Sequence, residues 1–302
     1  MEVLNDPAAA QTWCEDALNQ GESLGFVATM GALHAGHLSL IRRSARENSR
    51  TVVSVFVNPL QFDEQTDFEA YPRDLEADAR LAGEAGADLV FSGKLDQFFE
   101  GQLDADGRLP KERLRDPGPA ALGLEGDQRR GHFAGVATIV ARLFRCVTPT
   151  RAYFGAKDFQ QSLVVRGCRD DQGRPEVIVC PTLREPSGLA LSSRNQRLSP
   201  AEREQALHMV RALRAAHGAW QAGLRDAAEL EGVLASSLAP GIQAREIDVE
   251  YAAVRDPDRW TPTRPGESLH SAVALVAARV GAVRLIDNAR LDQDPFGGGE
   301  ER

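Results

Sequence analysis

Short apolar segments alternate with longer segments of helical periodicity between Leu24 and Cys180. The apolar segments are rich in β-branched residues and predict strands at Leu24–Ala28, Thr51–Val57, Asp88–Phe91, Arg151–Phe154 and Glu176–Cys180. The periodic segments predict helices at Leu38–Glu47, Arg73–Glu84, Gly135–Val147 and Asp158–Arg169. Because strands and helices alternate, we expect an α/β fold with a parallel sheet that is covered by helices on both faces.

The pattern changes after Pro181, where two helices are followed by strands. The helices are predicted at Pro200–Gly223 and Asp226–Leu238, and the strands near Ile247–Val254, Val273–Arg279 and Val283–Ile286. We therefore expect a first domain over residues 1–183, a smaller α+β domain over 184–290, and a disordered tail over 291–302, which contains three consecutive glycines. The polar segment Lys94–Gln128 is predicted to be a loop within the first domain.

Composition narrows the possible partners. The chain has 302 residues, 42% of them hydrophobic, and a formal net charge of −9, which argues against nucleic acid and acidic membranes as partners. No targeting segment or membrane span is evident in the sequence. The four cysteines, Cys14, Cys146, Cys168 and Cys180, show no CxxC spacing. These features predict a cytoplasmic protein with reduced cysteines and no zinc site.

Two histidines and two glycines lie in the run Met30-Gly31-Ala32-Leu33-His34-Ala35-Gly36-His37, between a predicted strand and a predicted helix. The start of a helix attracts anions, because its first N–H groups have no partners within the helix. Gly36 lets a phosphate approach the backbone, and the imidazolium groups of His34 and His37 could donate hydrogen bonds to it. The alternative is that both histidines are exposed or bind a metal.

Candidate residues follow other strands as well. Asn58 and Gln61 surround Pro59 and could bind a hydroxyl and a carboxylate without adding charge, although an ordinary Asn-Pro turn would look the same. Lys157 is one of only three lysines among 35 basic residues, which favours a compact ammonium group there, unless it escaped the arginine bias by chance. Since His34, Asn58 and Lys157 all follow strands, we expect them at one edge of the sheet.

Two further clusters are basic or polar. Arg129-Arg130 precedes a helix start, which suits either an anion or a simple helix cap. Leu191-Ser192-Ser193-Arg194-Asn195 combines hydroxyl, guanidinium and amide groups. This second cluster is a plausible clamp for a triphosphate, but its composition is also that of an ordinary loop.

The ordered motifs together resemble one known family. The runs that carry the resemblance are TMGALHAGHLSLIRRS, VSVFVNPLQF, AYPRDLEAD, LEGDQRRGHFAGVATIV, YFGAKDFQQ, LREPSGLALSSRNQRLSP and VRLIDN, from about Gly25 to Asn288. They resemble pantoate–β-alanine ligase. The resemblance implies that ATP and pantoate form pantoyl adenylate and pyrophosphate, after which β-alanine displaces AMP to give pantothenate. It also implies Mg²⁺, a homodimer, and a Rossmann-like first domain with a second domain that closes over the ATP site.

The resemblance also implies roles for individual residues. The residues implied to bind ATP are Met30, Gly31, His34, Gly36 and His37, then Gly155, Ala156, Lys157 and Asp158, then Leu183, Leu191, Ser192, Ser193 and Arg194. Gln61 and Gln161 are implied to hold pantoate, Asn58 and Tyr71 to line its pocket, and Gln61 also to lie near β-alanine. The implied catalytic residues are His37, as proton donor, with His34 and Lys157. Mg²⁺ would be held mainly by the ATP phosphates, with Asp78 or Asp158 as candidate protein ligands.

Some positions depart from the family's pattern. Ala35 replaces an acidic residue, Ala28 a proline, and Ala156 a glutamate, while Pro186-Ser187 stands where a residue followed by Asp is usual. Two other functions therefore stay open: an adenylyl- or cytidylyltransferase with the same histidine turn, and a nucleotide-binding module without activity.

Overall fold

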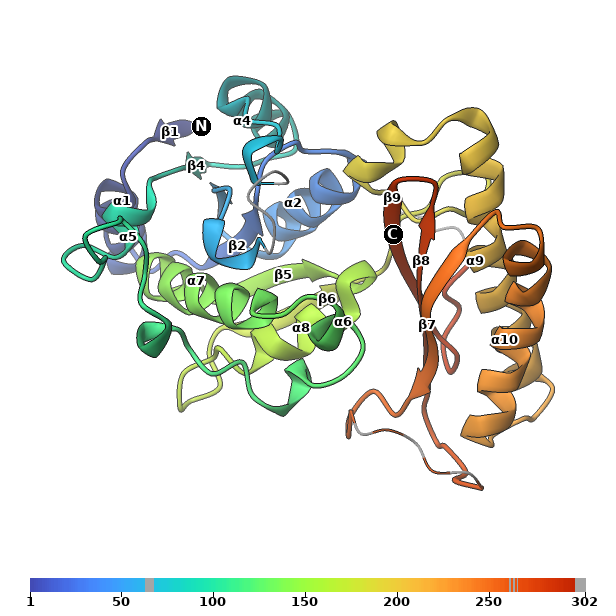
Figure 1. The fold of residues 1–302 in the computed structure, drawn as a ribbon. Helices are drawn as coiled ribbons and strands as arrows, with labels where there is room; N and C mark the ends of the chain where they lie inside the picture. Colours follow the sequence, from blue (N-terminus) through green and yellow to red (C-terminus); the bar gives the residue numbers. More distant parts are fainter. Residues whose placement is uncertain (63–67, 261, 263, 265, 297–302) are drawn as a thin grey trace. The chain divides into compact units, whose positions relative to one another are not determined.

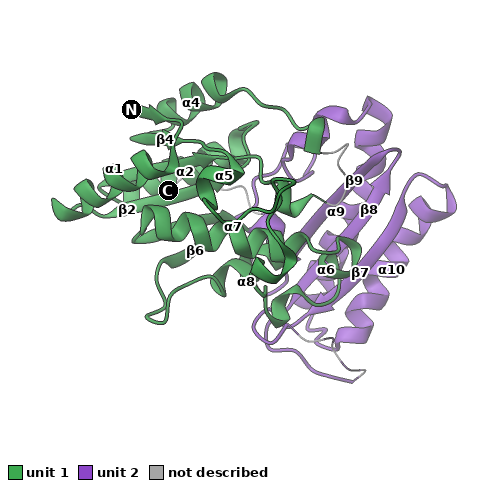
Figure 2. Ribbon diagram, turned by 60° about the vertical axis from the view of Figure 1, so that its left-hand side comes forward, with its two compact units in different colours: residues 1–155, 159–180 green, residues 156–158, 181–302 purple. Residues whose placement is uncertain are grey.

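The computed structural model describes residues 1–62, 68–260, 262, 264 and 266–296, which Figure 1 traces from one end to the other. The chain divides into two compact units, coloured separately in Figure 2. Unit 1 comprises Met1–Gly155 and Phe159–Cys180, and unit 2 comprises Ala156–Asp158 and the chain from Pro181 onward. The division thus lies at Cys180/Pro181, earlier than the predicted boundary at residue 183, and the segment around Lys157 belongs with unit 2.

Unit 1 is built on a six-stranded parallel sheet with the order β1-β4-β3-β2-β5-β6. Its strands are β1 (Glu2–Leu4), β2 (Leu24–Thr29), β3 (Arg50–Val55), β4 (Leu89–Phe91), β5 (Arg151–Gly155) and β6 (Glu176–Cys180). Every strand predicted for the first domain is present, with β3 ending at Val55 instead of residue 57. The predicted α/β fold with a parallel sheet is confirmed.

Helices cover both faces of this sheet. The main ones are α1 (Pro7–Asn19), α2 (Ala35–Glu47), α4 (Leu75–Glu84), α7 (His132–Val147) and α8 (Phe159–Arg166), as Figure 1 shows. Neighbouring strand residues point to opposite faces. In β2, Phe26 therefore packs in the core that contains α1, α7 and α8, whereas Val27 packs in the core that contains α2 and α4. Apolar runs without polar alternation are what a strand covered on both faces requires.

The first strand and helix were missed by the sequence analysis. Most of the fully buried side chains of α1 are small, namely Ala10, Cys14 and Ala17, so its apolar pattern is weak, although Trp13 and Leu18 also pack against the core. Its start does carry a signal, because Asp6 accepts a hydrogen bond from the N–H of Ala8 and Pro7 occupies the first turn.

The segment 94–128 is a loop with several short turns, as predicted. These are α5 (Leu95–Phe98), η2 (Lys111–Arg113), η3 (Pro119–Ala121) and α6 (Glu125–Gln128). Phe98 and Leu109 are buried in the core of unit 1. The amide of Gln160 in α8 donates to the carbonyls of Ala120, Leu122 and Gly123. The loop is therefore anchored to the fold at several points.

Unit 2 contains an antiparallel sheet with the order β7-β8-β9 and two long helices. Its elements are η4 (Ala156–Asp158), η5 (Ser193–Arg197), α9 (Pro200–Gln221), α10 (Ala227–Gln243), β7 (Asp248–Arg255), β8 (Val273–Val280) and β9 (Val283–Arg290). The predicted α+β architecture is confirmed. Leu291 is fully buried in the core of this unit and Phe296 packs against it, so the tail predicted to be disordered from residue 291 does not begin there. Residues 297–302 lie outside the described residues.

Candidate active site

The strand order of unit 1 changes direction at β2. The strands β3 and β4 lie on one side of it, and β5 lies on the other, with Phe26 of β2 paired to Ala152 of β5. In open parallel sheets, ligands bind outside the carboxyl ends of the strands at such a switch point. The segments that follow β2 and β5 begin at Met30 and Ala156, and both belong to the predicted site.

The loop between β2 and α2 is held by a buried carboxylate. Asp78 of α4 is only 3% exposed, and its two oxygens accept hydrogen bonds from the N–H groups of Ala32 at 3.0 Å and Leu33 at 2.8 Å. Gly31 has a φ of +88°, and a Cβ there would lie 2.7 Å from Asp78 Oδ2. The carboxylate thus fixes the loop backbone, and glycine is the residue that fits beside it.

His34 and His37 are tied to the helix start through the same ring nitrogen. His34 is the N-cap of α2, and its Nδ1 accepts a hydrogen bond from the N–H of Gly36 at 3.1 Å. The Nδ1 of His37 accepts in turn from the N–H of His34 at 3.4 Å. The two ring centroids are 4.2 Å apart. The structure therefore brings both predicted histidines together.

These contacts bear on the tautomer of both rings. Because Nδ1 accepts in each ring, the proton of the neutral imidazole is on Nε2. An imidazolium would carry a proton on Nδ1 as well and could not accept there. The capping contacts fit neutral rings with the proton on Nε2, and the imidazolium donors expected from the sequence stay a prediction.

Gly36 and Ala35 occupy different surroundings in the first turn of α2. A Cβ on Gly36 would lie 2.8 Å from His34 Cε1, so glycine leaves room for the imidazole that caps the helix. Ala35 is exposed. An acidic residue there would interact favourably with the positive end of the helix, and alanine gives up that contribution of about 0.3–1 kcal/mol.

Asn58 and Gln61 lie together after β3, in and beside the turn η1 (Pro59–Gln61). The buried Asn58 accepts from the N–H of Leu60 and donates from Nδ2 to Gln61 Oε1 at 3.0 Å. Gln61 Nε2 donates to Met30 Sδ at 2.9 Å. The first loop and the Asn58–Gln61 segment are thus in direct contact. Asn58 holds the neighbouring glutamine, a role that an ordinary Asn-Pro turn would not have.

Arg129 and His132 hold the backbone of Gln61, a role that was not predicted from the sequence. His132 Nδ1 donates to the carbonyl oxygen of Gln61 at 2.9 Å, and Arg129 Nη2 donates to the same oxygen at 3.3 Å. The helix α7 begins at His132, and its N-cap residue is Gly131, which supplies no side-chain cap. The cap considered for the Arg129-Arg130 pair is therefore not formed, and the anion site stays a prediction.

The paired glutamines of α8 differ in their surroundings. Gln160 is buried and anchors the loop around Ala120, whereas Gln161 is half-buried at the start of the helix. Tyr71 packs edge-on against Phe62, with ring centroids 5.8 Å apart. Of the predicted pantoate residues, Asn58 and Gln61 are therefore in mutual contact, and Gln161 and Tyr71 belong to other segments of unit 1.

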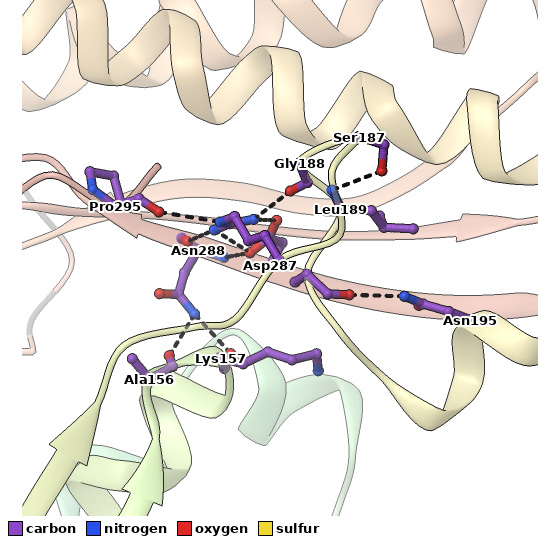
Figure 3. A network of polar contacts seen from close by, with 11 residues as sticks. Ala156, Lys157, Ser187, Gly188, Leu189, Asn195, Asp287, Asn288 and Pro295 are labelled. Atoms are coloured by element: carbon purple, nitrogen blue, oxygen red, sulfur yellow. Dashed lines mark hydrogen bonds and ion pairs between the residues drawn. The ribbon is translucent and has the colours of Figure 1, made fainter. Parts of the chain in front are cut away.

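Lys157 lies in the short turn η4, directly after β5. Its side chain is 18% exposed, with Nζ 3.9 Å from Asp158 Oδ1. Figure 3 shows the carbonyl oxygens of Ala156 and Lys157 facing the side-chain amide of Asn288 in β9, while the Lys157 side chain leads away from that amide. On the β5 side of the turn, a Cβ built on Gly155 meets no described atom within 4 Å.

The predicted clamp from Leu191 to Asn195 forms a turn in unit 2. The N–H of Leu191 donates to the carbonyl of Leu183, and Ser192 caps η5 by accepting from the N–H of Arg194. Ser192, Ser193 and Arg194 are half-buried. The turn is fixed by Asn195, which is 3% exposed and donates from Nδ2 to Glu185 Oε1 and to the carbonyl of Ala190.

Ser187 stands where the family usually has Asp, and it takes part in a small turn. Its Oγ accepts from the N–H of Leu189 at 3.4 Å, a contact that spans Gly188. A serine hydroxyl makes such turns more weakly than an Asp carboxylate. The departure at Pro186-Ser187 therefore retains the turn.

The described part of the chain contains no cluster of three or more His, Cys, Asp or Glu side chains that could hold a metal ion. Asp78 uses both carboxylate oxygens for backbone N–H groups, whereas Asp158 is 49% exposed. No helix among the described residues is long and apolar enough to cross a membrane.

A parallel sheet with a histidine-bearing strand-to-helix turn at its switch point defines a nucleotide-binding α/β protein of the Rossmann-like class. The sequence model of the family Pantoate-beta-alanine ligase matches residues 2–290. The chain belongs to this family. The pantothenate synthetase of Rubrobacter xylanophilus is 48% identical over 291 residues, which are 96% of this chain and 98% of that protein.

Solved structures agree with this membership. Pantothenate synthetase from Thermus thermophilus superposes with a TM-score of 0.82 at 41% identity and covers 96% of this chain and 99% of its own. Pantoate-beta-alanine ligase from Francisella tularensis, complexed with beta-gamma ATP and beta-alanine, has a TM-score of 0.73 at 30% identity, covering 98% of this chain and 99% of its own. Family membership favours a ligase over the rival adenylyl- or cytidylyltransferase.

Proposed function

We propose that this protein condenses pantoate with β-alanine at the expense of ATP, through pantoyl adenylate. The observation that carries the proposal is the His34–His37 pair at the start of α2, in a loop whose first residue, Met30, accepts from Gln61. The pair supplies donors for phosphates, and the glutamine supplies an uncharged partner for a carboxylate. The complex of the Francisella tularensis relative with beta-gamma ATP and beta-alanine supports the same substrates here.

In the first step, a carboxylate oxygen of pantoate attacks the α-phosphorus of ATP, and the bond to the β-phosphate breaks. We assign His34 and His37 to the phosphates, where Nε2–H donors and the N–H groups of the helix start offset the charge on pyrophosphate. We propose that Lys157 and Arg194 offset the same negative charge on pyrophosphate. Gln61 and Gln161, with Asn58 and Tyr71 at the pocket, orient pantoate without lowering its nucleophilicity through an ion pair.

In the second step, the amine of β-alanine attacks the acyl carbon of the adenylate, and AMP leaves. No protein side chain becomes covalently attached, because the adenylate is itself the activated acyl group. Water must be excluded while the adenylate is bound, because water would hydrolyse it. The second domain is proposed to provide that exclusion, and Leu183, Leu191, Ser192 and Ser193 are proposed as its nucleotide contacts, together with Gly155, Ala156 and Asp158.

Mg²⁺ is proposed as a companion of ATP, bound mainly to its phosphate oxygens and neutralising part of their charge. Of the two candidate protein ligands, Asp158 fits better, because the oxygens of Asp78 already accept two backbone N–H groups. A homodimer and a cytoplasmic location are proposed from the family resemblance. Light scattering after size-exclusion chromatography tests the dimer, and fractionation of cells tests the location.

Purified protein with Mg²⁺ and ATP tests the reaction itself. We expect pyrophosphate only when pantoate is added and AMP only when β-alanine follows. Pyrophosphate released with a phosphorylated acceptor, and none with pantoate, would contradict the ligase. ATP binding without any turnover would favour the inactive nucleotide-binding module.

A further inference from the structure

Asp287 and Asn288 are adjacent polar residues of strand β9, and their side chains lie on opposite faces of the sheet. Asp287 lies on the face of Val283, Leu285 and Ala289, which pack in the core with α9 and α10. Asn288 points to the other face, as the pleat of a strand requires. Both are buried, at 4% and 5% exposure. Buried polar groups require partners, and each of these residues holds a different segment of the chain.

Asn288 holds the turn that bears Lys157. Its Nδ2 donates to the carbonyl oxygen of Ala156 at 2.9 Å and to that of Lys157 at 2.8 Å, as Figure 3 shows. One amide group thus satisfies two consecutive carbonyls of a segment more than a hundred residues away in the sequence. The turn η4 is only three residues long and has no side-chain cap of its own. The amide of Asn288 therefore holds two of the three residues of this turn by their carbonyls.

Asp287 anchors the strand on the other face. Its carboxylate forms a bidentate pair with Arg184, at 2.7 Å and 3.0 Å, and the two side chains are 3% and 9% exposed. Arg184 donates further to the carbonyls of Gly188, Asn288 and Pro295. The five contacts match the five N–H donors of a guanidinium. Asp287 and Arg184 thus fix this end of β9 on the face opposite the Asn288 side chain, which gives Asn288 a rigid support.

We propose that Asn288 is a positioning residue for Lys157, holding the lysine through the carbonyls of its turn so that the ammonium group reaches the ATP phosphates. The inference rests on the proposed role of Lys157 in the reaction. Lysine has a long flexible side chain, so the position of its backbone sets the region that the ammonium group can reach. The Asn288 amide donates to backbone carbonyls of the turn, whereas the Lys157 side chain leads away from that amide (Figure 3).

The test combines Asn288→Leu with Lys157→Ala in a double-mutant cycle. Leucine keeps the branched shape of asparagine but has no donor. We expect N288L to lower kcat/KM for ATP about 10- to 100-fold, the cost of a misplaced group near the reacting atoms. In the Lys157→Ala background we expect N288L to change the rate by no more than about twofold, because the residue that it positions is gone. A structural defect alone would lower both backgrounds equally.

Asn288→Asp and Arg284→Gln complete the design. N288D keeps the size of the side chain and replaces the donating NH₂ by an oxygen, so it should lose activity as N288L does and serves where N288L does not fold. Arg284 lies on the same strand as Asn288 and donates to Glu250 Oε2 at 2.7 Å. R284Q removes that contact and should stay within about twofold of wild type. Thermal unfolding of each variant monitors the fold.

Each result has a definite meaning. Folded N288L or N288D with normal kcat/KM, or an undiminished loss in the Lys157→Ala background, would overturn the positioning role. Normal activity of Lys157→Ala would instead show that the proposed function of the lysine is wrong, and the inference would fall with it.

Discussion

The Nδ1 of His37 accepts a hydrogen bond from the backbone N–H of His34, the residue that itself caps the helix. The two imidazoles therefore hold the N–H groups of Gly36 and His34 at the helix start before any substrate binds. Each ring accepts a backbone N–H through Nδ1. In each ring, Nδ1 stabilises the helix start, and Nε2 is the atom proposed to contact phosphate. Substitutions can test these two roles separately.

His34→Asn should keep the fold and lose the chemistry. The amide oxygen of asparagine can accept from the N–H of Gly36 as an N-cap, but asparagine has no atom equivalent to Nε2. We expect the free energy of unfolding to stay within about 0.5 kcal/mol, whereas His34→Ala should lose about 1 kcal/mol. Pantoate-dependent pyrophosphate release should fall about 100-fold or more in both. Urea unfolding and the release assay measure the two effects, and full turnover of H34N would refute the assigned role.

Lys157→Ala and His37→Ala should each lower pyrophosphate release by about two orders of magnitude or more, the size expected for a lost phosphate-directed donor. Lys111→Ala is a matched control, because Lys111 lies in the exposed turn η2. Near-normal turnover of both site variants would mean that the roles assigned to them are wrong.

Asp78→Asn should loosen the loop after β2. Asparagine keeps one acceptor but turns an NH₂ group toward a backbone N–H, so one hydrogen bond to a charged group is lost. We expect a loss of about 2 kcal/mol in the free energy of unfolding and a lower kcat/KM for ATP. Asp74→Asn at the N-cap of the same helix is the control, because Asn caps as well as Asp, and among the described residues the Asp74 carboxylate accepts only from Ala77. Equal stability of the two variants would argue against the role given to Asp78.

Two glycines of the site should respond oppositely to alanine. Gly155 has a φ of −79° and no described atom within 4 Å of a built Cβ, so Gly155→Ala should leave the free energy of unfolding unchanged or raise it by about 0.4–1 kcal/mol. If the nucleotide approaches this backbone, KM for ATP rises nevertheless. Gly31→Ala should lose at least about 1–2 kcal/mol, because alanine is strained at positive φ and its Cβ would meet Asp78. A normal KM in G155A would remove Gly155 from the ATP site.

Alkaline pH should destabilise the protein through its buried thiols. Burial raises the pKa of Cys14 to about 12 and the pKa values of Cys146 and Cys168 to about 11, from 9.0. Below pH 9 these groups are protonated in both states and contribute no pH dependence. Above it, the unfolded chain loses protons that the folded chain keeps, so the free energy of unfolding falls as pH rises toward 11–12. Urea unfolding between pH 7 and about 10.5 measures this decline.

Thiol labelling offers an independent check of the same burial. All four cysteines are buried, so a thiol reagent at pH 8 should modify them only after denaturant is added. A cysteine of the native protein that reacts within seconds would contradict the described environment.

The sequence predicted the strands and helices of both units well where the pattern was strong. The α/β alternation and the turn from Met30 to His37 were readable because they depend on neighbours in the chain. The helix α1 was missed because alanine and cysteine give little contrast between its faces. The capping contact of His34 was not predicted, because such a contact cannot be seen in a sequence.

The supporting residues could not be found in the same way. Asp78 holds Leu33 across 45 positions, and Asn288 holds Lys157 across 131. His132 supports Gln61 in a comparable manner. In each case a common polar residue acquires its role only when folding brings it to a distant backbone group, and a single sequence contains no signal for such a pair.

Exchange of labelled pyrophosphate into ATP tests the central claim most directly. If a pantoate carboxylate displaces pyrophosphate at the site of His34, His37 and Lys157, the first step is reversible and complete without the amine. The account predicts exchange in the presence of pantoate and Mg²⁺ without β-alanine, and its loss in Lys157→Ala. Exchange that requires β-alanine, or none at all in a protein that still forms pantothenate, would contradict the adenylate route.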